Sequence, residues 1–414
     1  MGVSARFWVT LHYYKTNEWN SMAKYKLKNL LKEFHAGKSI ASGSIKDVGK
    51  YPVFGGNGQR GYTDTYNQGG QYLIIGRQGA YCGNVRYNIG KAFLTEHAIV
   101  GQANEGNNAI YLALKLSLMD LGKLQGQSAQ PGLSVETLSC ISLDIPSKEI
   151  QDTIAKIIVT LDKKIALNRQ INDNLEAMAK QLYDYWFVLF DFPNEEGKPY
   201  KSSGGAMVWN EKLKREIPQG WHCGTLLDIA EYTNGLACQK YRPTDNNKLP
   251  VIKIKEMHDG LSADTEWVKT DIPDDVKVFD GDVLFSWSAS LEVMLWTYGN
   301  GGLNQHIFKV TSKNGYPRSF YFYQLIHYVG IFKQMAEARK TTMGHITQDH
   351  LKQSTIALPP NVDIANKLEE KLCPIFDEIV KNNQEIIVLT KQRDELLPLL
   401  MNGQATVNYH LSAY

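Results

Sequence analysis

The feature that most constrains the fold is an internal repeat, because two copies of one pattern require two copies of one structural unit. Residues 133–146, LSVETLSCISLDIP, match residues 346–359, ITQDHLKQSTIALP, in apolar pattern and in the closing proline. Each copy leads into a long stretch with helical periodicity. The 414 residues also exceed the ~100–200 of one ordinary domain. The sequence therefore predicts two related halves, each a globular domain followed by a long helix.

Both helical stretches place mostly apolar residues in alternating steps of four and three, the spacing of a coiled-coil seam. In the first stretch these residues are Ile154, Ile158, Leu161, Ile165, Asn168, Asn172, Leu175, Ala179, Leu182 and Trp186. In the second they are Leu368, Leu372, Ile375, Ile379, Asn382, Ile386, Leu389, Arg393, Leu396 and Leu400. We interpret the stretches as partners in one antiparallel coiled coil. The alternative is two amphipathic helices, each packed on its own domain.

Asn168 and Asn382 occupy equivalent places in the two seams. A polar residue at a seam position costs stability but fixes register, since a shifted pairing leaves its amide unsatisfied among apolar neighbours. We therefore expect these two asparagines to set the register of the coiled coil.

A second recurrence lies inside the globular parts. GQYLIIGRQGA at residues 70–80 resembles GDVLFSWSAS at 281–290, and LTEHAIV at 94–100 resembles LNQHIFKV at 303–310. Short apolar runs broken by Gly and Asn are typical of strands. The predicted fold class is α+β: two β-rich domains, at 24–146 and 221–359, separated by two long antiparallel helices, at 147–190 and 360–402, in a pseudo-twofold repeat. Residues 191–220, rich in Pro, Gly and Ser, should form an ordered but irregular linker.

Composition excludes several classes of protein. Hydrophobic content of 43% and 22 tyrosines indicate a packed chain rather than a disordered one. The apolar runs are shorter than the ~20 residues that span a bilayer. Residues 1–21 lack the apolar core of a signal peptide, so we expect a cytoplasmic protein. Met22 opens a plausible alternative start, and residues 1–21 are interpreted as an extension without structural role. Five widely spaced cysteines argue against a disulfide framework and against a zinc site.

Charge is concentrated locally. The net charge is only +2, but residues 24–100 carry eleven lysines and arginines against four acidic residues. Residues 221–345 carry thirteen basic and fourteen acidic residues, so basic character there is confined to short clusters. Basic patches are the electrostatic footprint of a nucleic-acid-binding surface.

The linker region YDYWFVLFDFPNEEGKPYKSSGGAMVWNEKLKREIPQGW, at residues 183–221, resembles the central region of type I restriction-modification specificity subunits. The resemblance extends to YPVFGGNGQRGYTDTY, YLIIGRQGAYCGNV, DVLFSWSAS and LNQHIFKV, and covers roughly residues 24–407. It implies two target-recognition domains, each reading one half of a bipartite double-stranded DNA site. It also implies partners: two modification (methyltransferase) subunits and restriction/translocase subunits. S-adenosylmethionine, ATP and Mg would be bound by those partners, and this chain would hold no cofactor and no metal.

The candidate DNA-binding residues follow from this interpretation. Arg77 comes directly after an apolar run and is flanked by Gly76 and Gly79, and arginine makes the commonest specific base contact because its fork matches the guanine edge. The alternatives are a structural salt bridge for Arg77 and a plain exposed turn for GGNGQRGY. The other candidates are Arg60, Tyr62, Tyr81 and Arg86 in the first domain, and Lys240, Arg242, Lys253, Lys255, Arg339, Lys340 and Thr341 in the second.

The rival functions lack their motifs. A P-loop needs GxxxxGK[ST], and Gly37-Lys38-Ser39 lacks the earlier glycine. The alternative of a stand-alone or fused methyltransferase or restriction enzyme calls for a Pro-Pro motif with an aromatic residue, whereas Pro359-Pro360 is followed by Asn361. We therefore expect no catalytic residues. His97 and His306 occupy equivalent places in the two repeats and are interpreted as structural.

Overall fold

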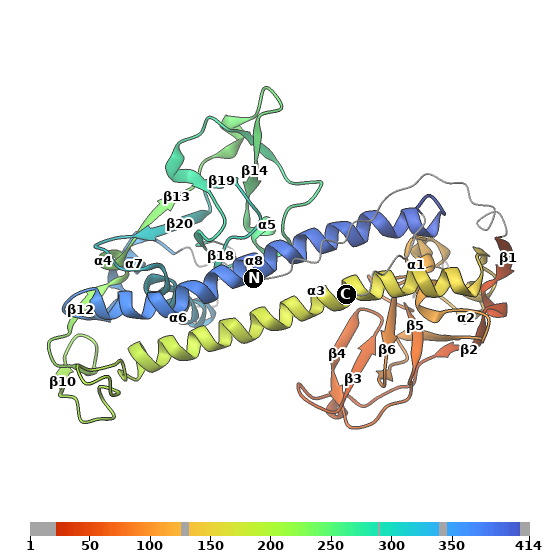
Figure 1. Ribbon diagram of the computed structural model, residues 1–414, viewed down its shortest axis with the longest axis horizontal. Coiled ribbons are helices and arrows are strands. Elements are labelled where there is room, and N and C mark those ends of the chain that lie inside the picture. Colours follow the sequence, from red (N-terminus) through yellow and green to blue (C-terminus); the bar gives the residue numbers. More distant parts are fainter. Residues whose placement is uncertain (1–21, 126–131, 289, 339–345, 406–414) are drawn as a thin grey trace, which may run out of the picture. The chain divides into compact units, whose positions relative to one another are not determined.

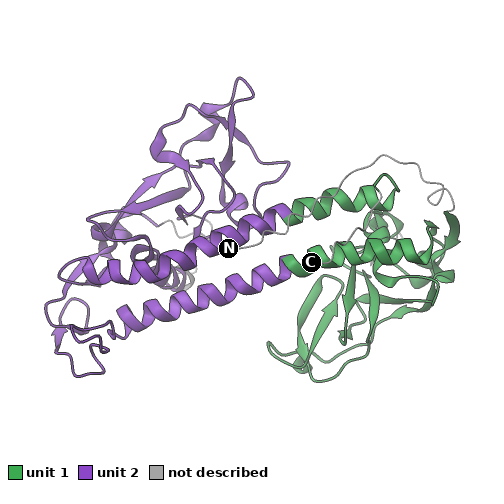
Figure 2. Ribbon diagram, viewed as in Figure 1, with its two compact units in different colours: residues 1–164, 389–414 green, residues 165–388 purple. Residues whose placement is uncertain are grey.

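The computed structural model describes residues 22–125, 132–288, 290–338 and 346–405. Its contacts divide the chain into two compact units (Figure 2). The first unit comprises residues 1–164 and 389–414, and the second comprises residues 165–388. Each unit therefore contains one globular domain and a part of each long helix.

The first domain is built from two sheets (Figure 1). The larger sheet is antiparallel, in the order β2-β8-β5-β6, and the smaller has the order β4-β3-β7 with β3 and β7 parallel. A separate antiparallel pair joins β1 to β9. The elements are β1 (Ala23–Lys26), β2 (Leu31–Ala36), β3 (Tyr51–Gly55), β4 (Gly58–Thr63), β5 (Gln71–Gly76), β6 (Val85–Ile89), β7 (Phe93–Leu94), β8 (Ala98–Ala103), α1 (Ala109–Ser117), α2 (Val135–Ser139) and β9 (Ser142–Ile145).

Strand β5 has an unbroken run of apolar residues, from Tyr72 to Ile75, because both of its faces are buried. Side chains of a strand alternate between the two faces of its sheet. Leu73 and Ile75 join the core that contains α1, whereas Tyr72 and Ile74 join a separate core with Leu94 of β7. Both faces of β5 are therefore buried.

The second domain repeats this arrangement. Its antiparallel sheet has the order β13-β20-β17-β18, its second sheet β15-β14-β19-β16 again contains one parallel pair, and β12 pairs with β21. The elements are β12 (His222–Thr225), α4 (Leu226–Ile229), β13 (Ala230–Asn234), β14 (Lys248–Ile252), α5 (Ile254–Asp259), β15 (Trp267–Lys269), β16 (Lys277–Val278), β17 (Val283–Ser286), β18 (Glu292–Leu295), β19 (Gly301–Leu303), β20 (Ile307–Ser312), α6 (Arg318–Ala338), α7 (Gln348–Gln353) and β21 (Thr355–Leu358). The predicted α+β class with an internal repeat is confirmed.

Two long helices follow the domains: α3 (Lys148–Tyr183) and α8 (Asp363–Met401). In the first unit, Ile158 near the start of α3 shares a core with Leu400 near the end of α8. In the second unit, Asn172 late in α3 donates to the carbonyl of Ile379 in the first half of α8. The helices therefore pair antiparallel within each unit, as predicted, and every predicted seam residue is buried or half-buried.

The segment after α3 differs from the expected irregular connection. Residues 184–188 form a π-helical turn, and β10 (Met207–Asn210) pairs with β11 (Arg215–Pro218) in a hairpin. The side chain of Asn210 accepts hydrogen bonds from the N–H groups of Lys212 and Leu213, which closes the hairpin turn. The polar, Gly-rich segment 191–220 therefore contains an ordered hairpin with a tight turn in addition to loops.

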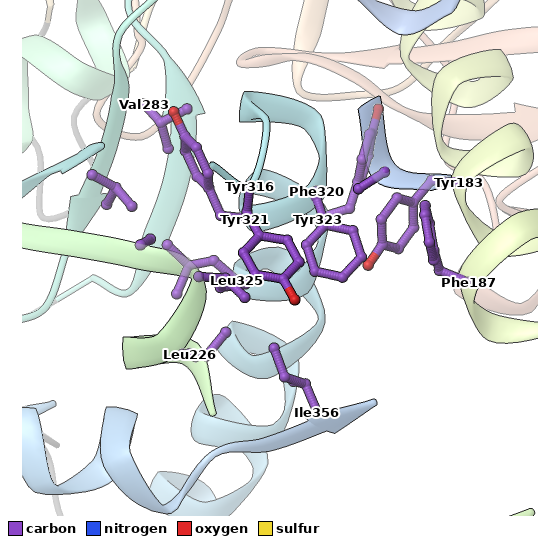
Figure 3. Close-up of a cluster of buried hydrophobic side chains, with 14 of the residues drawn as sticks. Tyr183, Phe187, Leu226, Val283, Tyr316, Phe320, Tyr321, Tyr323, Leu325 and Ile356 are labelled. Carbon is purple, nitrogen blue, oxygen red and sulfur yellow. The ribbon is translucent and has the colours of Figure 1, made fainter. Parts of the chain in front are cut away.

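Aromatic side chains fix this segment to the second domain. Phe187 lies 4.9 Å from Phe320 of α6, and Tyr183 lies 4.9 Å from Tyr323, measured between ring centroids (Figure 3). Such pairs contribute about 0.5–1.5 kcal/mol beyond the area they bury. The end of α3 is therefore anchored in the second unit's core.

No helix in the described part of the chain is long and apolar enough to cross a membrane.

Candidate nucleic-acid interface

The hairpin of β3 and β4 carries the first candidate residue. Val53 pairs with Gly61 and Phe54 pairs with Gln59, so Arg60 between them has no partner on β3. Such a β-bulge changes the direction in which a side chain points. Arg60 is exposed on this bulge.

Glycines in the hairpin turn allow two arginines to lie against the backbone. Gly58 has a φ of +119°, and a Cβ there would lie 2.5 Å from Nη1 of Arg86. A Cβ at Gly55 would lie 3.0 Å from Cδ of Arg60. The positive φ of Gly58 favours glycine there, and the side chains of Arg60 and Arg86 lie against Gly55 and Gly58, which pair with each other across the hairpin.

Arg77 is held next to the same turn by its backbone. Its N–H donates to the carbonyl of His97 at 2.9 Å, and its carbonyl accepts from the N–H of Leu133 at 2.9 Å. A Cβ at Gly56 would lie 2.9 Å from that His97 carbonyl, so the hairpin turn packs directly on this segment. We call Arg60, Arg77 and Arg86 the arginine cluster.

The tyrosine candidates border the cluster differently. Tyr81 is 51% exposed, and its carbonyl lies 2.4 Å from where a Cβ of Gly76 would be, close to Arg77. Tyr62 is half-buried at the other end of β4, where its backbone pairs with Lys46. The backbone of Tyr81 thus packs beside Gly76, the neighbour of Arg77, whereas Tyr62 lies at the far end of β4.

The arginine cluster has free charge. Among the residues that the structure describes, none forms a hydrogen bond or an ion pair with the three guanidinium groups. The structural salt bridge considered for Arg77 therefore has no partner in the described chain. Arg60 is exposed and Arg77 and Arg86 are half-buried, and a guanidinium without an ion partner can take a phosphate or the edge of a guanine. Contact of these residues with DNA stays a prediction.

The second domain has a tryptophan at the place of Arg77. The N–H of Trp287 donates to the carbonyl of His306 at 3.3 Å, and its carbonyl accepts from the N–H of Ile346 at 3.0 Å. These bonds repeat those of Arg77 with His97 and Leu133. The indole N–H of Trp287 donates to Asn234 at 3.0 Å. At this position the two repeats therefore present different chemistry.

The lysine candidates of the second domain have acidic partners. Lys253, at the start of α5, contacts Glu266 at 2.5 Å, and Lys255 lies 3.7 Å from Asp264. The hydrogen bond from Lys253, then its charge, hold the pKa of Glu266 below its ordinary value, and Arg242 adds to this. Lys240 and Arg242 are exposed. Arg339, Lys340 and Thr341 lie outside the described residues.

The asparagines of the seam meet in a pattern that the sequence did not predict. Asn382 donates to Oδ1 of Asn172 at 2.9 Å, and Asn172 donates to Oδ1 of Asn383 at 2.8 Å. Asn168 donates instead to Glu385 at 2.8 Å. Equivalent positions of two antiparallel helices need not face each other, which is why the partner of Asn382 is Asn172. The four-three spacing places Asn172 in the seam, four residues after Asn168. This spacing was the sequence signal that could have marked Asn172 as a candidate partner of Asn382.

No group of three or more His, Cys, Asp or Glu side chains among the described residues could hold a metal ion. Nδ1 of His97 lies 3.2 Å from the side chain of Gln78, and its Nε2 lies 3.6 Å from Glu96.

Comparison with known proteins gives a consistent result. The family model described as type I restriction modification DNA specificity domain matches residues 19–177 and again 218–391. The chain is similar to the specificity subunit of the type I restriction enzyme MjaIX of Methanocaldococcus jannaschii, with 27% identity over 311 residues, covering 72% of this chain and 69% of that protein. It is 39% identical over 154 residues to the EcoprrI specificity subunit of Escherichia coli, covering 36% and 38%. The crystal structure of a type I S subunit from M. genitalium shares the fold, with a TM-score of 0.63, 14% identity and coverage of 94% and 98%.

Proposed function

Because the chain belongs to the type I restriction-modification DNA specificity family and is a specificity subunit, we propose that each of its two β-rich domains reads one half of a bipartite double-stranded DNA target. The observation that carries this proposal is the repetition. The family model matches once in each half of the chain, and the order and pairing of the main sheets recur. Two copies of one recognition unit in one chain suit a target with two separate blocks of read bases.

A specificity subunit recognises DNA and leaves catalysis to other subunits. The relatives favour this role over the alternative of a fused methyltransferase or restriction enzyme. Type I specificity subunits assemble with methylase and restriction subunits. We propose that two modification subunits and the restriction/translocase subunits join this chain in the cytoplasm. In this proposal S-adenosylmethionine, ATP and Mg bind to those partners.

The first experiment purifies the chain with its methyltransferase partner and measures the mass of the complex by light scattering. A pool of random duplexes is then selected on the complex and sequenced. We expect two blocks of fixed bases separated by a constant number of unread pairs. A single continuous block would contradict the proposal.

The chain without partners serves as the control. We expect it to transfer no methyl group from S-adenosylmethionine to DNA and to cleave neither DNA nor ATP. Methyl transfer by the highly purified single chain would show that it is an enzyme.

A further inference from the structure

The two recognition domains differ in how much free positive charge they present. In residues 24–100, all of which the structure describes, Lys46 pairs with Asp64, and no other lysine or arginine has an ion pair. The arginine cluster belongs to this group. Its charge is available to an incoming phosphate without the loss of an internal contact.

In the second domain five lysines are paired with carboxylates of the same domain, whereas Lys240, Lys248, Lys313 and Lys333 have no ion pair among the described residues. The closest contacts join a lysine on a strand or helix end to an acid on a neighbouring loop or strand. The pairs are Lys253–Glu266 (2.5 Å), Lys255–Asp264 (3.7 Å), Lys269–Asp271 (3.6 Å), Lys277–Asp274 (2.7 Å) and Lys309–Asp282 (2.9 Å).

The difference arises at equivalent places in one fold. The N–H of Thr95 donates to the carbonyl of Phe54 at 2.9 Å, and the N–H of Asn304 donates to that of Ile252 at 3.0 Å. Gly55 therefore corresponds to Lys253. The side chain of Arg60 packs against Gly55, whereas Lys253 forms an ion pair with Glu266. Together with Trp287 at the place of Arg77, this means that the described part of the second domain does not repeat the arginine cluster.

From these contacts we infer that the two domains contribute unequally to DNA affinity, with the first domain supplying most of the salt-dependent part. This inference rests on the proposed function. A lysine that moved from its carboxylate to a phosphate would leave the carboxylate beside the DNA, so the local charge would remain balanced. Counterion release scales with the number of phosphates neutralised, and free arginines contribute to it fully. The second domain then discriminates through hydrogen bonds and shape, with less help from charge.

The test measures the affinity of the complex of the chain and its methyltransferase partner for its target duplex over a range of salt concentrations. The double variant Arg60→Gln/Arg86→Gln removes two positive charges from the first domain. At about 0.9 per phosphate contact, the slope of log affinity against log salt should decrease by about 1.8. When salt is raised from about 50 to about 200 mM, the unmodified complex should therefore lose about 12-fold more affinity than the double variant does.

The matched variant Lys253→Gln/Lys255→Gln removes the same charge from the second domain. We expect the slope to change by less than about 0.5, because these lysines are already paired. Thermal unfolding of both variants checks that they fold. Equal decreases in slope for the two double variants would overturn the inference.

A second pair of variants tests whether pairing is the cause. Glu266→Gln frees Lys253, whereas Asp275→Asn removes an exposed acid that has no ion partner among the described residues. Glu266→Gln should steepen the slope by up to about 0.9, and Asp275→Asn should change it less. Equal effects would overturn the role of pairing. If the unmodified complex does not prefer its target over a scrambled duplex at any salt concentration, the proposed function itself fails.

Discussion

Replacing Asn172 with leucine should destabilise the pairing of α3 and α8, because the buried amide of Asn382 then loses its acceptor. The two residues are 5% and 6% exposed, and the hydrogen bond between them is 2.9 Å long. A buried donor left unsatisfied costs about 1–3 kcal/mol. Asn172 also gives up its bond to Asn383, worth about 1 kcal/mol, although half-buried Asn383 can bond to water. We expect a net loss of about 2 kcal/mol.

The double variant Asn172→Leu/Asn382→Leu separates this explanation from a simple packing defect. Two leucines at facing seam positions leave no amide unsatisfied, and replacing a buried polar pair by apolar residues is often neutral or stabilising. We therefore expect the double variant to recover most of the loss, with a coupling energy above about 0.5 kcal/mol.

The measurement is urea unfolding followed by far-ultraviolet circular dichroism, with hydrogen exchange to locate the change in α3 and α8. The reasoning is refuted if the losses of the two single variants simply add up in the double variant. It is also refuted if Asn172→Leu leaves the protection of both helices unchanged.

Three further predictions concern recognition, the linker and spacing. Arg77→Ala should weaken specific binding by about 1–3 kcal/mol in fluorescence anisotropy; methylation of the same sites at unchanged efficiency would make Arg77 purely structural. The hydroxyl and N–H of Ser202 hydrogen-bond the carboxylate of Asp191 and hold its pKa below the ordinary 3.8, so its stabilisation is present above that value and is lost on acidification. Asp191→Asn should thus lower the melting temperature more near pH 7 than near pH 2, and equal shifts at both would contradict this. Four residues added to both helices, after Leu167 and after Ile386, should lengthen each by ~6 Å and change the unread spacer by about one or two base pairs. Methylome sequencing tests this, and an unchanged spacer with full activity would show that the length of the helices does not set the spacer.

The parts of the fold that were predictable depend on local pattern. The four-three spacing from Ile154 to Trp186 depends only on the geometry of one helix, so the seam could be found without its partner. The run from Tyr72 to Ile75 could be recognised as a buried strand because both of its faces are covered. The repeat then predicted that the second domain shares the fold of the first.

The parts that were missed depend on how separate elements meet. The contact of Asn382 with Asn172 requires the register of two helices, which the spacing within each helix does not give. The bulge at Arg60 depends on its partner strand. Lys253 pairs with Glu266, thirteen residues further along the chain. The sequence alone does not show that these two residues meet, so it gave no sign that the charge of Lys253 is neutralised.

The central claim is that the two domains read two separate blocks of one DNA target. Its most direct test is methylome sequencing of a host without other DNA methyltransferases that carries this chain and its methyltransferase partner, alongside the same host with Arg77→Ala. We expect one bipartite motif with a constant spacer, and we expect Arg77→Ala to relax bases in one block while the other stays fixed. A continuous motif, or a variant that alters both blocks equally, would contradict the account.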